Sequence, residues 1–122
     1  MSLLRKKFKL ALEEYILKGL KDNYVNAIID NDKITEVYSV RANDPNVDFE
    51  NLLGHVDPIT CKSTFFFKAK CENQGMFTDK IFEFNCQLNV AYHQKNSEFI
   101  FSELGNYFPR ISSLDPRFYM KI

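Results

Sequence analysis

The residues best suited to acid–base chemistry are a histidine and an aspartate two positions apart, His55 and Asp57, which are followed by Pro58. A histidine beside a carboxylate can bind and release a proton near neutral pH, as general acid–base catalysis requires. Most such pairs are surface residues, and two side chains in a loop need not face the same way. His55 and Asp57 are therefore weak catalytic candidates, and the sequence favours a protein that is not an enzyme.

Three cysteines, Cys61, Cys71 and Cys86, are odd in number and show no CxxC spacing. This pattern favours reduced thiols in a core over a zinc site or a disulfide framework. The two histidines, His55 and His93, are far apart in the chain and belong to no HxxxH motif, and the glycines are too isolated to form a phosphate-binding loop. We therefore expect no metal and no cofactor.

The composition predicts one domain over residues 1–122. Sixteen basic and sixteen acidic side chains cancel, so the net charge offers no general attraction to nucleic acid. Apolar runs such as residues 65–67 are far too short to cross a bilayer. We therefore expect a soluble cytoplasmic protein that does not bind nucleic acid. We also expect no helix of this chain to span a membrane. Twelve phenylalanines and six tyrosines predict a core of aromatic side chains on strands.

Residues 4–29 are expected to form one long helix, because apolar residues recur there at spacings of three and four. The stripe consists of Leu4, Phe8, Ala11, Leu12, Tyr15, Ile16, Gly19, Leu20, Val25 and Ile28. Asp30, Asn31 and Asp32 favour a turn and end the helix.

Four basic residues lie in the first turns of this helix, where the helix dipole is already positive: Arg5, Lys6, Lys7 and Lys9. A solvated basic turn is the simpler interpretation. The alternative is a helix cut from a longer chain, whose upstream part holds an anchor or another domain. In that case the protein would be exported or anchored to a membrane.

Four strands are expected near residues 33–42, 60–71, 76–92 and 98–104. In the first, alternation places Ile34, Tyr38 and Val40 on one side. Between the first two strands, Asp48 caps a short helical segment that Gly54 ends.

The second and third strands each have one apolar face. When the two strands pair antiparallel, their apolar faces lie on the same side of the sheet only if the connecting loop has an even number of residues. A four-residue turn over residues 72–75 satisfies this condition and sets Cys71 opposite Met76 and Cys61 opposite Cys86. The last two cysteines would then form a disulfide in an exported protein, or two buried thiols in a reducing compartment.

The tail, residues 105–122, carries aromatic side chains that a disordered polar tail would lack. Tyr107, Phe108, Phe118 and Tyr119 are candidates for an interaction surface. The whole element order, a long helix followed by a meandering sheet, resembles the cystatin-like or NTF2-like architecture, in which a curved antiparallel sheet wraps a helix.

Such folds serve several functions, so we carry three hypotheses. The first is a noncatalytic protein-binding or assembly module, including a homodimer formed through the sheet. The second is a small-molecule-binding protein or enzyme with a pocket between helix and sheet, lined by Tyr38, Phe65, Phe67, Phe82 and Phe84. The third is the soluble domain of a membrane-associated secretion or conjugation component.

Overall fold

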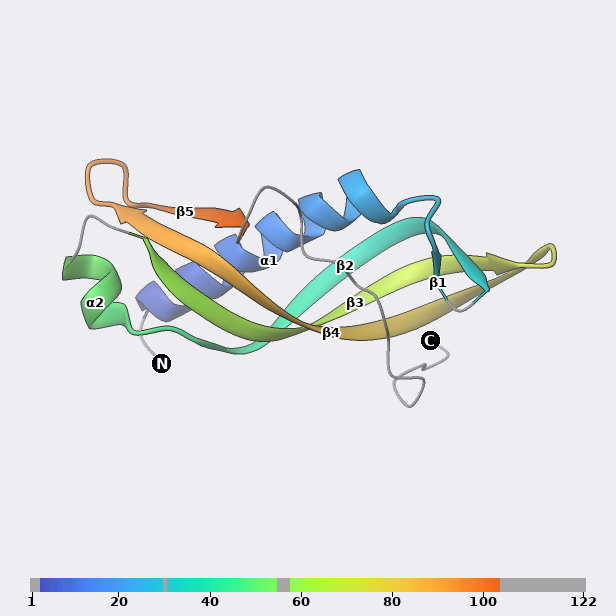
Figure 1. The fold of residues 1–122 in the computed structure, drawn as a ribbon, viewed down its shortest axis with the longest axis horizontal. Coiled ribbons are helices and arrows are strands. Elements are labelled where there is room, and N and C mark those ends of the chain that lie inside the picture. The colour runs from blue at the N-terminus through green and yellow to red at the C-terminus, as the bar shows by residue number, and fades with distance from the viewer. Residues whose placement is uncertain (1–2, 30, 55–57, 104–122) are drawn as a thin grey trace.

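The computed structural model describes residues 3–29, 31–54 and 58–103, and in this part of the chain one long helix packs on an antiparallel sheet of five strands (Figure 1). The elements are α1 (Leu3–Tyr24), β1 (Ile28–Ile29), β2 (Asp32–Asn46), α2 (Phe49–Gly54), β3 (Ile59–Asn73), β4 (Met76–His93) and β5 (Glu98–Glu103). The strands lie in chain order, β1-β2-β3-β4-β5, and each is antiparallel to its neighbours. The α+β class and the antiparallel meander are thus confirmed, with one strand more than expected. None of the described helices is long and apolar enough to cross a membrane.

Helix α1 buries Phe8, Leu12, Ile16 and Leu20, which follow one another at the four-residue spacing that keeps side chains on one face. The helix ends at Tyr24, so the expected extension to Ile29 is wrong. Asn26 has a φ of 76°, in the left-handed region that interrupts a right-handed helix. Ile28 and Ile29 then form β1, which pairs with the start of β2.

Strand β2 does not keep the simple alternation that the sequence suggests. Its pairing with β3 shifts between Ile34 and Glu36 and again between Val37 and Ser39. Each bulge inserts one extra residue and reverses the phase of the side chains that follow. Val37 is therefore buried beside Ile34, whereas Tyr38, expected on the inner face, is 38% exposed.

The β3–β4 hairpin has a two-residue turn in place of the expected four-residue turn. Gln74 and Gly75 both have positive φ, 52° and 81°, as a type I′ turn requires. The even loop length keeps both apolar faces on the same side, but Cys71 lies opposite Thr78 and not Met76.

The shorter turn also separates the two cysteines that we expected to be opposite each other. Cys61 lies opposite Leu88, and Cys86 lies opposite Ser63. All three cysteines are buried; Cys61 and Cys71 are free, and the Cys86 thiol donates to the Gln87 carbonyl at 3.7 Å.

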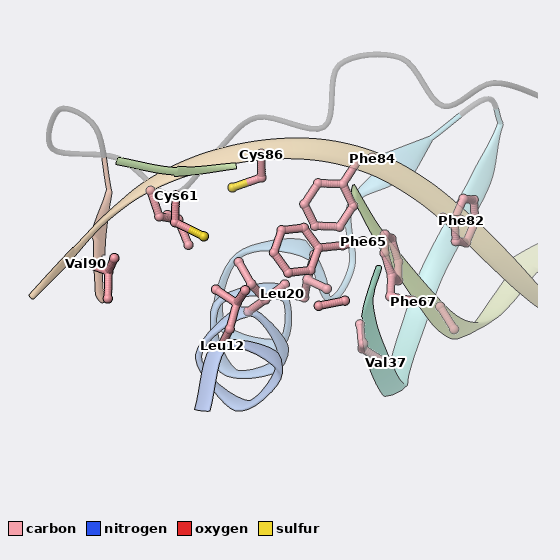
Figure 2. Close-up of a cluster of buried hydrophobic side chains, with 14 of the residues drawn as sticks. Leu12, Leu20, Val37, Cys61, Phe65, Phe67, Phe82, Phe84, Cys86 and Val90 are labelled. Atoms are coloured by element: carbon pink, nitrogen blue, oxygen red, sulfur yellow. The ribbon is translucent and has the colours of Figure 1, made fainter. Parts of the chain in front are cut away.

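The core lies between α1 and the inner face of the sheet. Phe65 stacks against Phe84 with ring centroids 5.3 Å apart, and Phe67 stacks against Phe82 at 5.0 Å. Figure 2 shows these rings on the same side of the strands as Leu12 and Leu20 of α1. Exposure of the four rings is between 1% and 7%, so they are core residues in contact with one another.

Candidate functional site

The outer face of the sheet, which points away from α1, carries rings with cationic side chains placed over them. Because side chains alternate along a strand, Phe66, Lys68 and Lys70 of β3 share this face. Three cation–ring pairs result: Lys70 Nζ lies 5.0 Å from the Phe77 ring centre, Lys68 Nζ 5.8 Å from that of Tyr38, and the Arg41 guanidinium carbon 5.1 Å from that of Phe66. We call these six residues the cation–aromatic ladder. Each pair contributes roughly 0.5–1 kcal/mol at an exposed site.

The charges on this face alternate in sign. Lys33 lies opposite Glu72 in the register, and Lys70 lies between Glu36 on one side and Asp79 on the other. No broad stripe of one sign results. Attraction to the phosphate backbone of nucleic acid needs clustered positive charge, which these opposed pairs do not provide.

Strand β4 has a long open edge next to this face. It pairs with β3 over its length from Met76 to Val90, but β5 pairs with it only from Leu88 to His93. Among the described strands, none pairs with the other side of β4 between Met76 and Gln87. We call this stretch the open edge of β4. Figure 1 shows the β3–β4 hairpin extending well beyond β5.

Elsewhere, β1 and β5 are short, and β2 beyond its pairing with β1 is interrupted by bulges and contacts α1 through an amide. β1 has two residues and β5 six, and short edge strands offer little backbone for pairing. On β2, the amide of Ala42 donates to the Glu13 carboxylate of α1 at 2.8 Å. Beside β5, Lys7 of α1 donates to the backbone carbonyl of Ser97 at 2.5 Å.

The side chains of the open edge are divided between the two faces. On the inner face, Lys80 forms an ion pair with Asp32, whose side chain is 7% exposed. On the outer face lie Phe77, Asp79, Ile81 and Glu83 in alternation. At the tip of the β3–β4 hairpin, Met76 and Phe77 are 72% and 59% exposed, so two large apolar side chains point into solvent there.

Three shallow hollows lie on the described part of the molecule, on more than one of its faces. A hollow of about 590 Å³ is bordered by Asn43, Lys62, Ser63, Thr64, Asn85, Cys86 and Gln87. One of about 500 Å³ lies between α1 and β5, and one of about 420 Å³ lies beside Tyr38, Lys21 and Val25. None of these three is lined by the four core phenylalanines.

The described residues offer little chemistry for catalysis. Burial raises the pKa of the Cys61 thiol to about 11, and burial with a smaller contribution from Asp32 does the same for Cys71. A protonated, inaccessible thiol is a poor nucleophile. Cys86 and Ser63 border the largest of the three hollows, but no histidine or carboxylate lines it to act as a base. Within residues 3–29, 31–54 and 58–103, no group of His, Cys, Asp or Glu is arranged to hold a metal ion.

Of the residues that the sequence singled out, Tyr38 belongs to the ladder and the four phenylalanines belong to the core. The catalytic candidates His55 and Asp57 lie outside the described residues, as do Tyr107, Phe108, Phe118 and Tyr119. Sequence reasoning missed the other ladder residues. Their signal was the polar face of residues 66–70, which alternates with the apolar face that was recognised.

Comparisons with known proteins gave no match, whether to a protein-family model, to a curated protein or to a solved structure.

Proposed function

We propose that the protein is a noncatalytic protein-binding module that adds an extended segment of its partner, as a further strand, to the open edge of β4. In strand addition, backbone hydrogen bonds supply affinity and the alternate side chains supply specificity. The observation that carries this proposal is the pairing of β4, which lacks a second described neighbour from Met76 to Gln87.

The ladder and the hairpin tip support the same proposal. Phe77 is exposed beside the open edge, and Tyr38 and Phe66 continue the aromatic surface towards the middle of the sheet. Aromatic and arginine side chains are the residues that most often dominate the binding energy of protein interfaces. A segment paired with β4 would bring its partner's adjoining residues over this surface.

We also propose that the fold is of the cystatin-like or NTF2-like kind, because a helix on a meandering antiparallel sheet is common to both. The buried Cys61 and Cys71 thiols are compatible with a reducing compartment, and we propose the cytoplasm. A small-molecule pocket between helix and sheet is less favoured, because the rings meant to line it are in mutual contact. Membership of a membrane-associated assembly is compatible with strand addition and would make the partner another component of that assembly.

The test is to select extended peptides from a random display library against the folded protein and to methylate their backbone amides one at a time. In a paired strand, successive amides point alternately towards and away from the neighbour. We expect methylation at alternate positions to abolish binding and methylation at the intervening positions to leave it intact. Equal effects at all positions would contradict strand addition.

Proline variants of β4 provide the matched control on the protein itself. Thr78 and Asp79 are adjacent, so one of their amides points to β3 and the other to the open edge. One of the variants Thr78→Pro and Asp79→Pro should therefore remain folded, as judged by circular dichroism, and lose peptide binding. If every proline variant that remains folded also retains full peptide binding, the proposal is wrong.

A further inference from the structure

We propose that the segment recruited by β4 carries two basic side chains four positions apart with an apolar residue midway between them, and that it comes from a different protein. This inference rests on the proposed function, and it names the partner by the chemistry of the open edge. The pattern is basic–x–apolar–x–basic.

The pattern follows from the outer-face side chains of β4. Asp79, Ile81 and Glu83 occupy successive positions on that face. Side chains directly opposite each other in paired strands share a face, so the residues of an added strand that face these three are also two positions apart. Opposite charges favour such pairs and like charges oppose them, and an apolar residue fits opposite Ile81.

No cation of the described residues neutralises either carboxylate. Asp79 accepts a hydrogen bond from the Tyr38 hydroxyl, whose pKa is raised by desolvation and by Asp79, but this uncharged donor leaves the negative charge of Asp79 uncompensated. Neither Asp79 nor Glu83 forms an ion pair with another described residue. Lys70 lies opposite Asp79 in the register, but its ammonium group lies over the Phe77 ring. Glu83 lies opposite Phe66, an uncharged residue.

The inner face of the same edge is already neutralised. Lys80 is paired with Asp32, and its neighbours on that face, Phe82 and Phe84, are buried. The inner-face residues of an added strand therefore meet no unpaired charge. Charge selection acts through the outer face alone.

A second copy of the chain does not satisfy this pattern. In a two-fold pair of β4 strands, opposed residues must share a face, so their numbers sum to an even value. Two registers overlap most of the open edge. The register centred on Ile81 sets Asp79 against Glu83 twice, and the register centred on Phe82 sets Glu83 against Ile81 twice. Neither supplies a counter-charge, so the edge charges oppose self-association, as charged edge strands commonly do.

Three synthetic peptides test the inference. The first is acetyl-Thr-Lys-Val-Ile-Val-Lys-Thr-amide, and the others replace both lysines by glutamine or by glutamate. Binding is measured by fluorescence anisotropy at low and at high salt. We expect the lysine peptide to bind about tenfold more tightly than the glutamine peptide, since each opposite-charge pair contributes up to a few-fold. The glutamate peptide should bind most weakly, and salt should reduce the differences.

The protein variant Asp79→Lys/Glu83→Lys should reverse this order, so that the glutamate peptide binds best. The matched control is Glu98→Lys/Glu14→Lys, which makes the same change of charge at the α1–β5 groove and should preserve the original order. Circular dichroism and sedimentation velocity show whether each variant is folded and monomeric.

The outcomes separate the two proposals. If all three peptides bind equally, the charge pattern is wrong while strand addition stands. If none binds the wild-type protein, strand addition itself fails. A wild-type dimer that dissociates on substitution of Ile81→Lys would overturn the assignment of the edge to a different protein.

Discussion

Exchanging Val37 and Tyr38 for threonine, one at a time, tests which of these neighbours faces the core. The binding surface depends on the answer, because Tyr38 belongs to the cation–aromatic ladder only if the bulge between Ile34 and Glu36 turns it outward. Val37 is 2% exposed and Tyr38 is 38% exposed. Threonine has nearly the shape of valine and suits a strand, so the main change at position 37 is a buried hydroxyl.

The two substitutions should differ clearly in free energy of unfolding. A buried hydroxyl without a partner costs about 1–3 kcal/mol, and we expect about 2 kcal/mol for Val37→Thr. Tyr38→Thr loses a partly exposed ring, one cation–ring contact and a solvent-exposed hydrogen bond to Asp79, and should cost about 1 kcal/mol or less. Urea unfolding followed by circular dichroism measures both values, with an unchanged m-value as the check that the unfolding reaction is the same. A larger loss at Tyr38 than at Val37 would refute the bulged register.

Further predictions concern the ion pair, the thiols and the hairpin turn. Lys80→Met leaves a buried carboxylate unpaired and should lower the free energy of unfolding by about 3 kcal/mol in urea titrations, and a loss near zero would show that the pair is solvated. Burial holds the pKa of Cys61 and Cys71 at about 11, above the 9.0 of a free thiol. The stability that their protonated forms contribute is therefore complete below pH 9 and should be lost as the pH rises from about 9 to about 11. Iodoacetamide at pH 8 should modify these two thiols only after unfolding. Gly75→Ala should cost about 1 kcal/mol because its φ is +81°, although no atom obstructs the added Cβ, whereas Gly54→Ala, equally unobstructed and without positive φ, should cost much less.

The parts of the fold that depend on local periodicity could be predicted from the sequence. The stripe of Phe8, Leu12, Ile16 and Leu20 identifies the buried face of α1 because helix geometry alone fixes it. Asp48 was expected to cap the short helix that follows, and its carboxylate accepts a hydrogen bond from the Asn51 amide at 3.2 Å. Long-range contacts have little influence on these features.

The features that were missed depend on pairing between distant strands. Parity required an even β3–β4 loop, and both two and four residues satisfy it. The positive φ of Gln74 and Gly75 decides for two. The bulges around Val37 have no strong local signature, because the pairing of β2 with β3 and its packing on α1 determine them.

The candidate site was only partly predictable for the same reason. Phe66, Lys68 and Lys70 alternate visibly with the apolar face of β3, so a polar outer face was implied. Which rings the cations cover depends on the register with β2 and β4. The open edge of β4 depends on the whole sheet, because among the described strands β5 pairs with β4 only as far as Leu88, well short of the start of β4 at Met76.

The most direct test of strand addition is amide hydrogen exchange, followed by nuclear magnetic resonance, with and without the lysine peptide. The account predicts new protection at alternate amides between Met76 and Gln87, with little change at those that already pair with β3. Protection confined to Glu98–Glu103 and the adjoining face of α1 would place the partner in the groove beside β5 and contradict the central claim.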